Sequence, residues 1–158
     1  MTTDEAAALR DVCAITRLDS RDALLLHRHA TVVYHLPRAD AVARIAPSDH
    51  AEAARLSIQV TRWLLSSGFP ATAPLDIEQP VVVRHSVVTF WHYHPQGNLP
   101  LPPVTRLAGL LRRLHSFGSP PFPLPPYKPL KGFLSALATF GHAVLQKEEH
   151  EFLRNRAD

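Results

Sequence analysis

Histidine is the residue type in this sequence whose spacing most readily invites a chemical role. The chain of 158 residues contains ten histidines, and the pairs His27/His29 and His92/His94 have His-x-His spacing. On a β-strand, that spacing directs both rings of a pair to the same face. A zinc site needs three or four converging ligands, and the sequence names no third ligand for either pair. Surface histidines suffice to explain the pairs, so we predict no metal ligand.

Nucleophilic catalysis finds no support in the residue types. Cys13 is the single cysteine, and it falls on the apolar face of a predicted N-terminal helix, where a thiol is typical of the core. The sequence contains neither a Gly-x-Ser-x-Gly segment nor a Walker-type glycine-rich loop. We therefore predict no catalytic residue. A single cysteine forms no intrachain disulfide and indicates no oxidising compartment, so we expect a cytoplasmic protein.

The composition favours a globular domain and excludes several partners. Apolar residues make up 46% of the chain and charged residues 20%. The net charge is +3, and the arginines are scattered singly between acidic residues, which argues against nucleic-acid binding. No apolar run approaches the roughly 20 residues that cross a bilayer, and the N-terminus does not resemble a signal peptide. We expect no membrane partner.

The first half of the chain predicts strands interrupted by one long helix. A helix over residues 3–17 has capping-box spacing at Thr2 and Glu5. Ser48 is the expected cap of the long helix, which runs to about Ser67, and Gly68 follows as a left-handed C-terminal cap. The predicted strands span residues 23–26, 31–36, 41–45, 80–84 and 87–91.

The second half predicts helices joined by proline-rich segments. Residues 95–103 are rich in proline and glycine and are interpreted as a linker. A helix begins at Pro103 and ends near Gly118, with its leucines on one face. Two more helices follow at about 131–146 and 148–156. Together the two halves predict an α+β fold.

Four segments carry a family resemblance. They are Val42-Ala43-Arg44-Ile45, Trp63-Leu64-Leu65-Ser66-Ser67-Gly68-Phe69-Pro70, Val88-Thr89-Phe90-Trp91-His92-Tyr93 and Leu107-Ala108-Gly109-Leu110-Leu111-Arg112-Arg113-Leu114-His115. In order and spacing over residues 23–130, the chain resembles the aminoglycoside and choline phosphotransferase superfamily. The resemblance implies a kinase-like small lobe over residues 1–94, with a five-stranded antiparallel sheet and one long helix. It also implies a hinge or linker at 95–103 and the first helices of an incomplete large lobe at 104–158.

The resemblance also assigns nucleotide-binding roles to particular residues. Arg44 takes the place of the cation that contacts the α- and β-phosphates, although it could simply be a surface arginine on an edge strand. Glu52 is the candidate to hold that cation, although the helix position aligned by Trp63 is nearer Ser57, which forms no ion pair. Glu52 could instead stabilise the start of its helix.

The hinge of the family hydrogen-bonds adenine through its backbone, and Phe90, Trp91, His92 and Tyr93 occupy it here. Their alternative role is packing between two lobes. The loop over the phosphates, residues 27–31, departs from the protein-kinase pattern because it contains no glycine.

The phosphoryl-transfer residues of the family do not occur in these 158 residues. No His-Gly-Asp segment is present, although the aspartate of that segment orients the acceptor hydroxyl in the family, and a later asparagine and aspartate hold magnesium. We therefore expect a truncated or incomplete phosphotransferase that retains the nucleotide-binding half. Its cofactor, by resemblance, is ATP or GTP with Mg²⁺, and its acceptor is a small molecule that the sequence does not identify.

Two other interpretations remain open from the sequence. One is a non-catalytic module that binds a nucleotide or a protein partner. The other is an inactive remnant that self-associates through the apolar face where a large lobe would pack.

Overall fold

A computed structural model describes residues 3–95, 97, 102–126, 128 and 130–157 of the chain. The contacts divide the chain into two compact units, residues 1–120 and 121–158, and each is described by itself. The predicted linker at 95–103 falls inside unit 1, and its residues 96 and 98–101 lie outside the described residues. The linker and the lobe boundaries therefore stay predictions.

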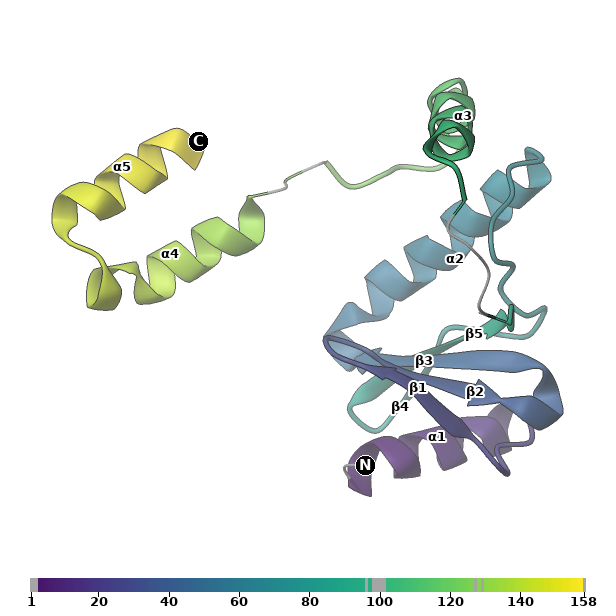
Figure 1. The fold of residues 1–158 in the computed structure, drawn as a ribbon. Helices are drawn as coiled ribbons and strands as arrows, with labels where there is room; N and C mark the ends of the chain where they lie inside the picture. The colour runs from purple at the N-terminus through teal and green to yellow at the C-terminus, as the bar shows by residue number, and fades with distance from the viewer. Residues whose placement is uncertain (1–2, 96, 98–101, 127, 129, 158) are drawn as a thin grey trace. The chain divides into compact units, whose positions relative to one another are not determined.

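Unit 1 contains a five-stranded sheet, three α-helices and two short 3₁₀ turns (Figure 1). In chain order the elements are α1 (Thr3–Thr16), β1 (Leu24–Arg28), β2 (Val32–Leu36), η1 (Pro37–Ala39), β3 (Ala41–Pro47), η2 (Ser48–His50), α2 (Ala51–Ser66), β4 (Val81–Val83), β5 (Ser86–His92) and α3 (Val104–His115). The predicted α+β class and the predicted antiparallel five-stranded sheet are confirmed.

The strands of the sheet lie in the order β1-β2-β3-β5-β4, and every neighbouring pair is antiparallel. β5, the last strand in the sequence, is therefore internal, between β3 and the edge strand β4. The predicted β4–β5 hairpin is confirmed, but its turn is Arg84-His85 and not His85-Ser86, because Val83 pairs with Ser86. Arg84 has a positive φ of 51°, which lets this tight turn close without a glycine.

The hydrophobic core lies between α1 and one face of the sheet. Successive strand residues point to opposite faces, and the buried members of β2 and β3 alternate strictly. α1 contacts β3, β4 and β5 on that face (Figure 1). The cluster joins Leu9, Val12 and Cys13 of the helix to the strand residues Val32, Tyr34, Leu36, Ala41, Ala43, Ile45, Val83, Val88 and Phe90, which confirms the predicted core position of Cys13.

Helix α2 lies over the opposite face of the sheet from α1 (Figure 1). The predicted cap at Ser48 is wrong: a 3₁₀ turn precedes α2, no side chain caps the helix, and the Ser48 N–H donates to His85 O at 3.0 Å. The predicted C-terminal cap is confirmed. Gly68 has φ +77°, its N–H donates to Leu65 O, and the Phe69 N–H donates to Leu64 O, the two bonds of a Schellman motif.

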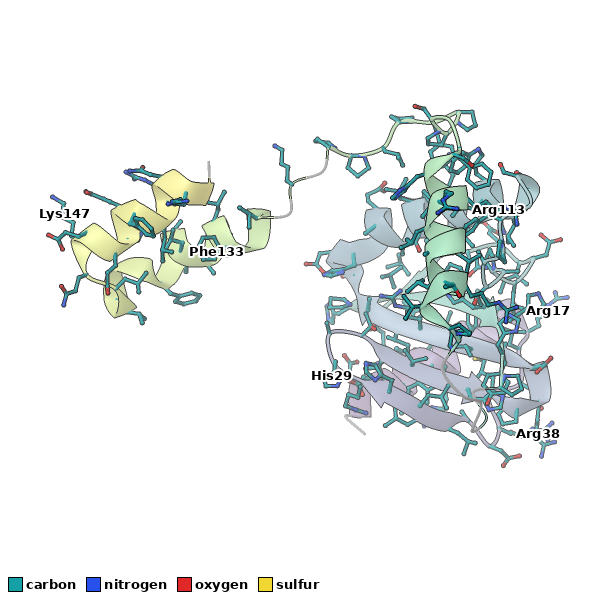
Figure 2. All side chains as sticks on the ribbon, turned by 45° about the horizontal axis from the view of Figure 1, so that its top comes forward. Arg17, His29, Arg38, Arg113, Phe133 and Lys147 are labelled. Carbon is teal, nitrogen blue, oxygen red and sulfur yellow. The ribbon has the colours of Figure 1, made fainter. Side chains whose placement is uncertain are left out.

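Helix α3 and the residues just after it contact the C-terminal end of α2. The Phe117 ring lies edge-on to the rings of Trp63 and Phe69, with centroids 6.0 Å apart in each case. Arg113, labelled on α3 in Figure 2, donates from Nη2 to Gly68 O at 2.6 Å. Three large apolar side chains of α3 remain exposed, namely Val104, Leu107 and Leu111. Self-association through this face stays a prediction.

Unit 2 is a pair of helices, α4 (Lys131–Val144) and α5 (Lys147–Ala157). The two contact each other, and His150 of α5 lies buried with Nε2 at 3.3 Å from Leu137 O. Within the described part of both units, no helix has the length and apolar character that a bilayer crossing requires.

Two valines on neighbouring strands test the position of the core. Val88 is fully buried in the cluster, whereas Val82 is 54% exposed on the edge strand β4. We predict that Val88→Ala lowers the free energy of unfolding by about 2 kcal/mol, because it removes buried methyl groups and leaves a cavity. The matched change Val82→Ala alters it by less than about 0.5 kcal/mol. Urea denaturation measures both, and equal losses would contradict the assignment of faces.

Cys13 offers a chemical probe of the same core. Burial raises the pKa of the Cys13 thiol from 9.0 to about 11, against a smaller lowering by the hydrogen bond with Ser20. The raised pKa contributes stability that is complete below pH 9 and is lost as the pH rises through about 11. We predict that Ellman's reagent modifies native protein slowly at pH 8 and denatured protein rapidly, because the thiolate is the reactive form. Equal rates would place Cys13 outside the core.

Candidate functional site

Arg44 lies near the middle of β3, on the face of the sheet that α1 does not cover. Its neighbours Ala43 and Ile45 are buried against α1, so the alternation of the strand directs Arg44 to the other face. In the sheet, Arg44 pairs with Val33 of β2 and Thr89 of β5. The guanidinium is exposed, although its strand is internal to the sheet.

Two adjoining cavities open on this face, with volumes of about 210 Å³ and 400 Å³. Arg44, Ser57 and Trp91 line both of them. The smaller cavity is completed by Thr31, Ala46, His50, Ala53, Ala54, Val87 and Thr89, and the larger by Leu26, Val33, Val42, Thr72, His92, Tyr93 and His94. Arg44 is therefore the charge at the point where the two cavities meet.

Six of the ten acidic residues of unit 1 lie beside a base other than Arg44. Five form ion pairs with an arginine, namely Glu5 with Arg28, Asp11 with Arg84, Asp19 with Arg21, Asp22 with Arg38 and Glu52 with Arg55, and Asp49 Oδ1 lies 4.0 Å from His50 Nε2. One of these pairs changes the pKa of its carboxyl clearly: hydrogen bonds from Arg21 lower the pKa of Asp19 to about 2. Among the described residues, Arg44 has neither an ion pair nor a hydrogen bond through its side chain.

Glu52 is not brought to Arg44. It lies in the first turn of α2, is exposed, and pairs with Arg55 one turn further along the helix. Ser57 lines the cavities instead. Five residues along an α-helix correspond to a rotation of roughly 140°, so the face that carries Ser57 cannot also carry Glu52. The glutamate–cation pair that the resemblance implies is therefore not formed between these two residues.

Trp91 and Tyr93 supply the aromatic surface of the site. The Trp91 indole N–H donates to Thr89 Oγ1 at 2.9 Å, which fixes the ring on the cavity side of β5. The Tyr93 ring stacks on His35 of β2, with centroids 3.7 Å apart and an interplanar angle of 21°. Trp91, Tyr93 and Arg44 all line the larger cavity.

Phe90 points the other way and is fully buried in the core beneath α1. Its backbone is also engaged. The Phe90 N–H donates to Gln79 Oε1 at 2.7 Å, and its carbonyl accepts from the Leu75 N–H at 2.9 Å. Because the Phe90 side chain lies in the core, it lines neither cavity.

The backbone N–H groups of the predicted hinge are largely occupied. The His92 N–H donates to Ala73 O at 2.9 Å, and the Tyr93 N–H donates to Asp40 O at 3.2 Å. The segment around residues 73–79 thus continues the sheet beside β5, where β4 has ended. Any adenine bound here would have to displace these hydrogen bonds before it used those N–H groups.

The cavity linings do not fit a magnesium ion. Mg²⁺ takes oxygen ligands, chiefly carboxylates and phosphates, whereas neither lining includes an aspartate or glutamate. Across the part of the chain that the structure describes, no three histidine, cysteine, aspartate or glutamate residues are grouped to hold a metal. His27 and His29 do meet, with ring centroids 4.6 Å apart, but as a pair.

Sequence reasoning missed His50, Thr31 and Thr72 as cavity residues. Each lies in a loop or a 3₁₀ turn, where no periodicity predicts the direction of a side chain. His50 lies in the 3₁₀ turn η2, where the sequence predicted the first turn of the long helix.

Comparison with known proteins identified no relative. No protein-family model matches the chain, and no curated protein or solved structure matches it significantly.

The Thr89–Trp91 hydrogen bond predicts a spectroscopic effect. Thr89→Val keeps the shape of the side chain but removes the acceptor, so we expect a shifted and broadened fluorescence emission from Trp91. The measurement uses a Trp63→Phe background, which leaves Trp91 as the single tryptophan. Thr16→Val removes a hydrogen bond from the end of α1 and serves as the control. Identical spectra for all three proteins would show that Thr89 does not position the indole.

Proposed function

We propose that unit 1 binds a nucleoside triphosphate on the sheet face that carries Arg44. The observation that supports this most directly is an arginine on an internal strand that lines two cavities and has no acidic partner among the described residues. A guanidinium is suited to phosphate because its planar donors match phosphate oxygens in pairs. The resemblance to phosphotransferases assigns the same role to the same residue.

The aromatic residues of the larger cavity are suited to the base. Trp91 and Tyr93 offer flat ring surfaces in the cavity that Arg44 also lines, and the Tyr93 ring is stacked on His35. Stacking discriminates weakly between bases, because every base has a π face. Since the hinge N–H groups are engaged within the protein, we propose that ATP and GTP bind with similar affinity.

The proposed activity is binding, and the chain resembles the nucleotide-binding half of an incomplete phosphotransferase. Phosphoryl transfer depends on groups that position the acceptor and the metal. The His-Gly-Asp segment that supplies them in the family does not occur in these 158 residues.

The test is thermal denaturation with and without nucleotide. We expect saturating ATP or GTP to raise the Tm of the full chain by about 3–8 °C, because a ligand that binds the folded state stabilises it. Arg44→Ala should abolish most of this shift, while Arg44→Lys should keep part of it. Because Arg44 is exposed, neither change should prevent folding.

Arg62→Ala is the matched control. Arg62 lies on α2, is exposed, and lines neither cavity, so the change removes the same charge from the protein but not from the site. Its nucleotide response should equal that of the unmodified chain. An absent shift with every nucleotide, or an equal loss in Arg44→Ala and Arg62→Ala, would overturn the proposal.

A further inference from the structure

The polar groups of the two cavities are mainly suited to donating hydrogen bonds to an anion. The guanidinium of Arg44 is a donor with a full positive charge. Three hydroxyl-bearing residues line the cavities with it, Ser57 in both, Thr31 in the smaller and Thr72 in the larger. Three histidines complete the polar lining, His50 in the smaller cavity and His92 and His94 in the larger one. These groups can donate hydrogen bonds to phosphate oxygens.

No carboxylate is among the residues that line the two cavities. The nearest to Arg44 along the chain are Asp40, Asp49 and Glu52; Asp49 Oδ1 lies 4.0 Å from Nε2 of the lining residue His50, and Glu52 pairs with Arg55. From Gln79 to Pro120, the remainder of unit 1, the sequence contains no aspartate or glutamate. That segment contributes β5, with Trp91, His92 and the residues after it, to the cavities.

We infer that the site over Arg44 binds the polyphosphate in its free form, without magnesium, and that magnesium weakens the binding. This inference rests on the proposed nucleotide binding and concerns the ionic form of the ligand. Mg²⁺ neutralises two of the negative charges that would face Arg44. The cation itself would also face a guanidinium, with no carboxylate in the lining to compensate.

A metal-free site of this kind differs from a site that binds a metal–nucleotide complex for phosphoryl transfer. A site built for that complex gains affinity from Mg²⁺, because the metal bridges phosphate oxygens and protein oxygens. A site with a guanidinium and donors alone loses affinity when Mg²⁺ occupies the phosphate oxygens. The sign of the magnesium effect therefore distinguishes the two.

Isothermal titration calorimetry of the full chain measures this sign directly. ATP is titrated once in EDTA and once with excess MgCl₂, at matched ionic strength. We expect roughly threefold to tenfold tighter binding in EDTA, because the free anion retains more charge at the guanidinium. Arg44→Ala should remove the difference between the two titrations, and Arg62→Ala should preserve it.

Inorganic tripolyphosphate and adenosine identify the part of the ligand that is recognised. Tripolyphosphate in EDTA should bind and should compete with ATP, whereas adenosine should bind far more weakly. Binding of adenosine but not of tripolyphosphate would overturn the inference.

The two proposals fail in different ways. Binding of ATP that requires Mg²⁺, or that is strengthened by it, would overturn the metal-free site and leave nucleotide binding intact. Absence of ATP binding in both titrations would overturn the proposed function and the inference with it.

Discussion

The packing of α1 against one face of the sheet is the interaction on which the rest of unit 1 depends. It buries the alternate residues of β2, β3 and β5, including Tyr34 and Phe90, in one continuous apolar cluster. Because strand side chains alternate, that burial commits the intervening residues to the other face. Arg44 and Trp91 are on the cavity side for this reason, and their placement follows from the core and not from any contact that they make themselves.

The second constraint is the internal position of β5. β5 pairs with β3 along its whole length, but β4 covers only its first residues. The remaining backbone groups of β5 are satisfied by the segment near residues 73–79, in which Gln79 bonds both the N–H and the carbonyl of Phe90. Buried backbone groups need such partners. The same arrangement holds Trp91 and Tyr93 in place and occupies the N–H groups that a kinase hinge would offer to adenine.

Arg44 differs from the other arginines of unit 1 because it lines the two cavities. Arg28, Arg38, Arg55 and Arg84 each have an acidic partner in unit 1, and these pairs are local or at the edges of the sheet. Exposed pairs of this kind stabilise a fold by little. Their effect on the site is to leave Arg44, among cavity residues that carry no acid, with its charge available to a ligand.

The sequence by itself determined the elements. Strand alternation, helical spacing and the glycine at position 68 predicted the helices, the strands, the left-handed C-terminal cap and the α+β class, because each depends on residues close together in the chain. It also singled out Arg44 and Trp91. Tertiary structure alone decided that Ser57, and not Glu52, faces Arg44, that Phe90 belongs to the core, and that the hinge N–H groups are engaged. Those outcomes depend on which distant segment lies beside which strand and on the rotation of α2 about its axis, and no local pattern specifies either.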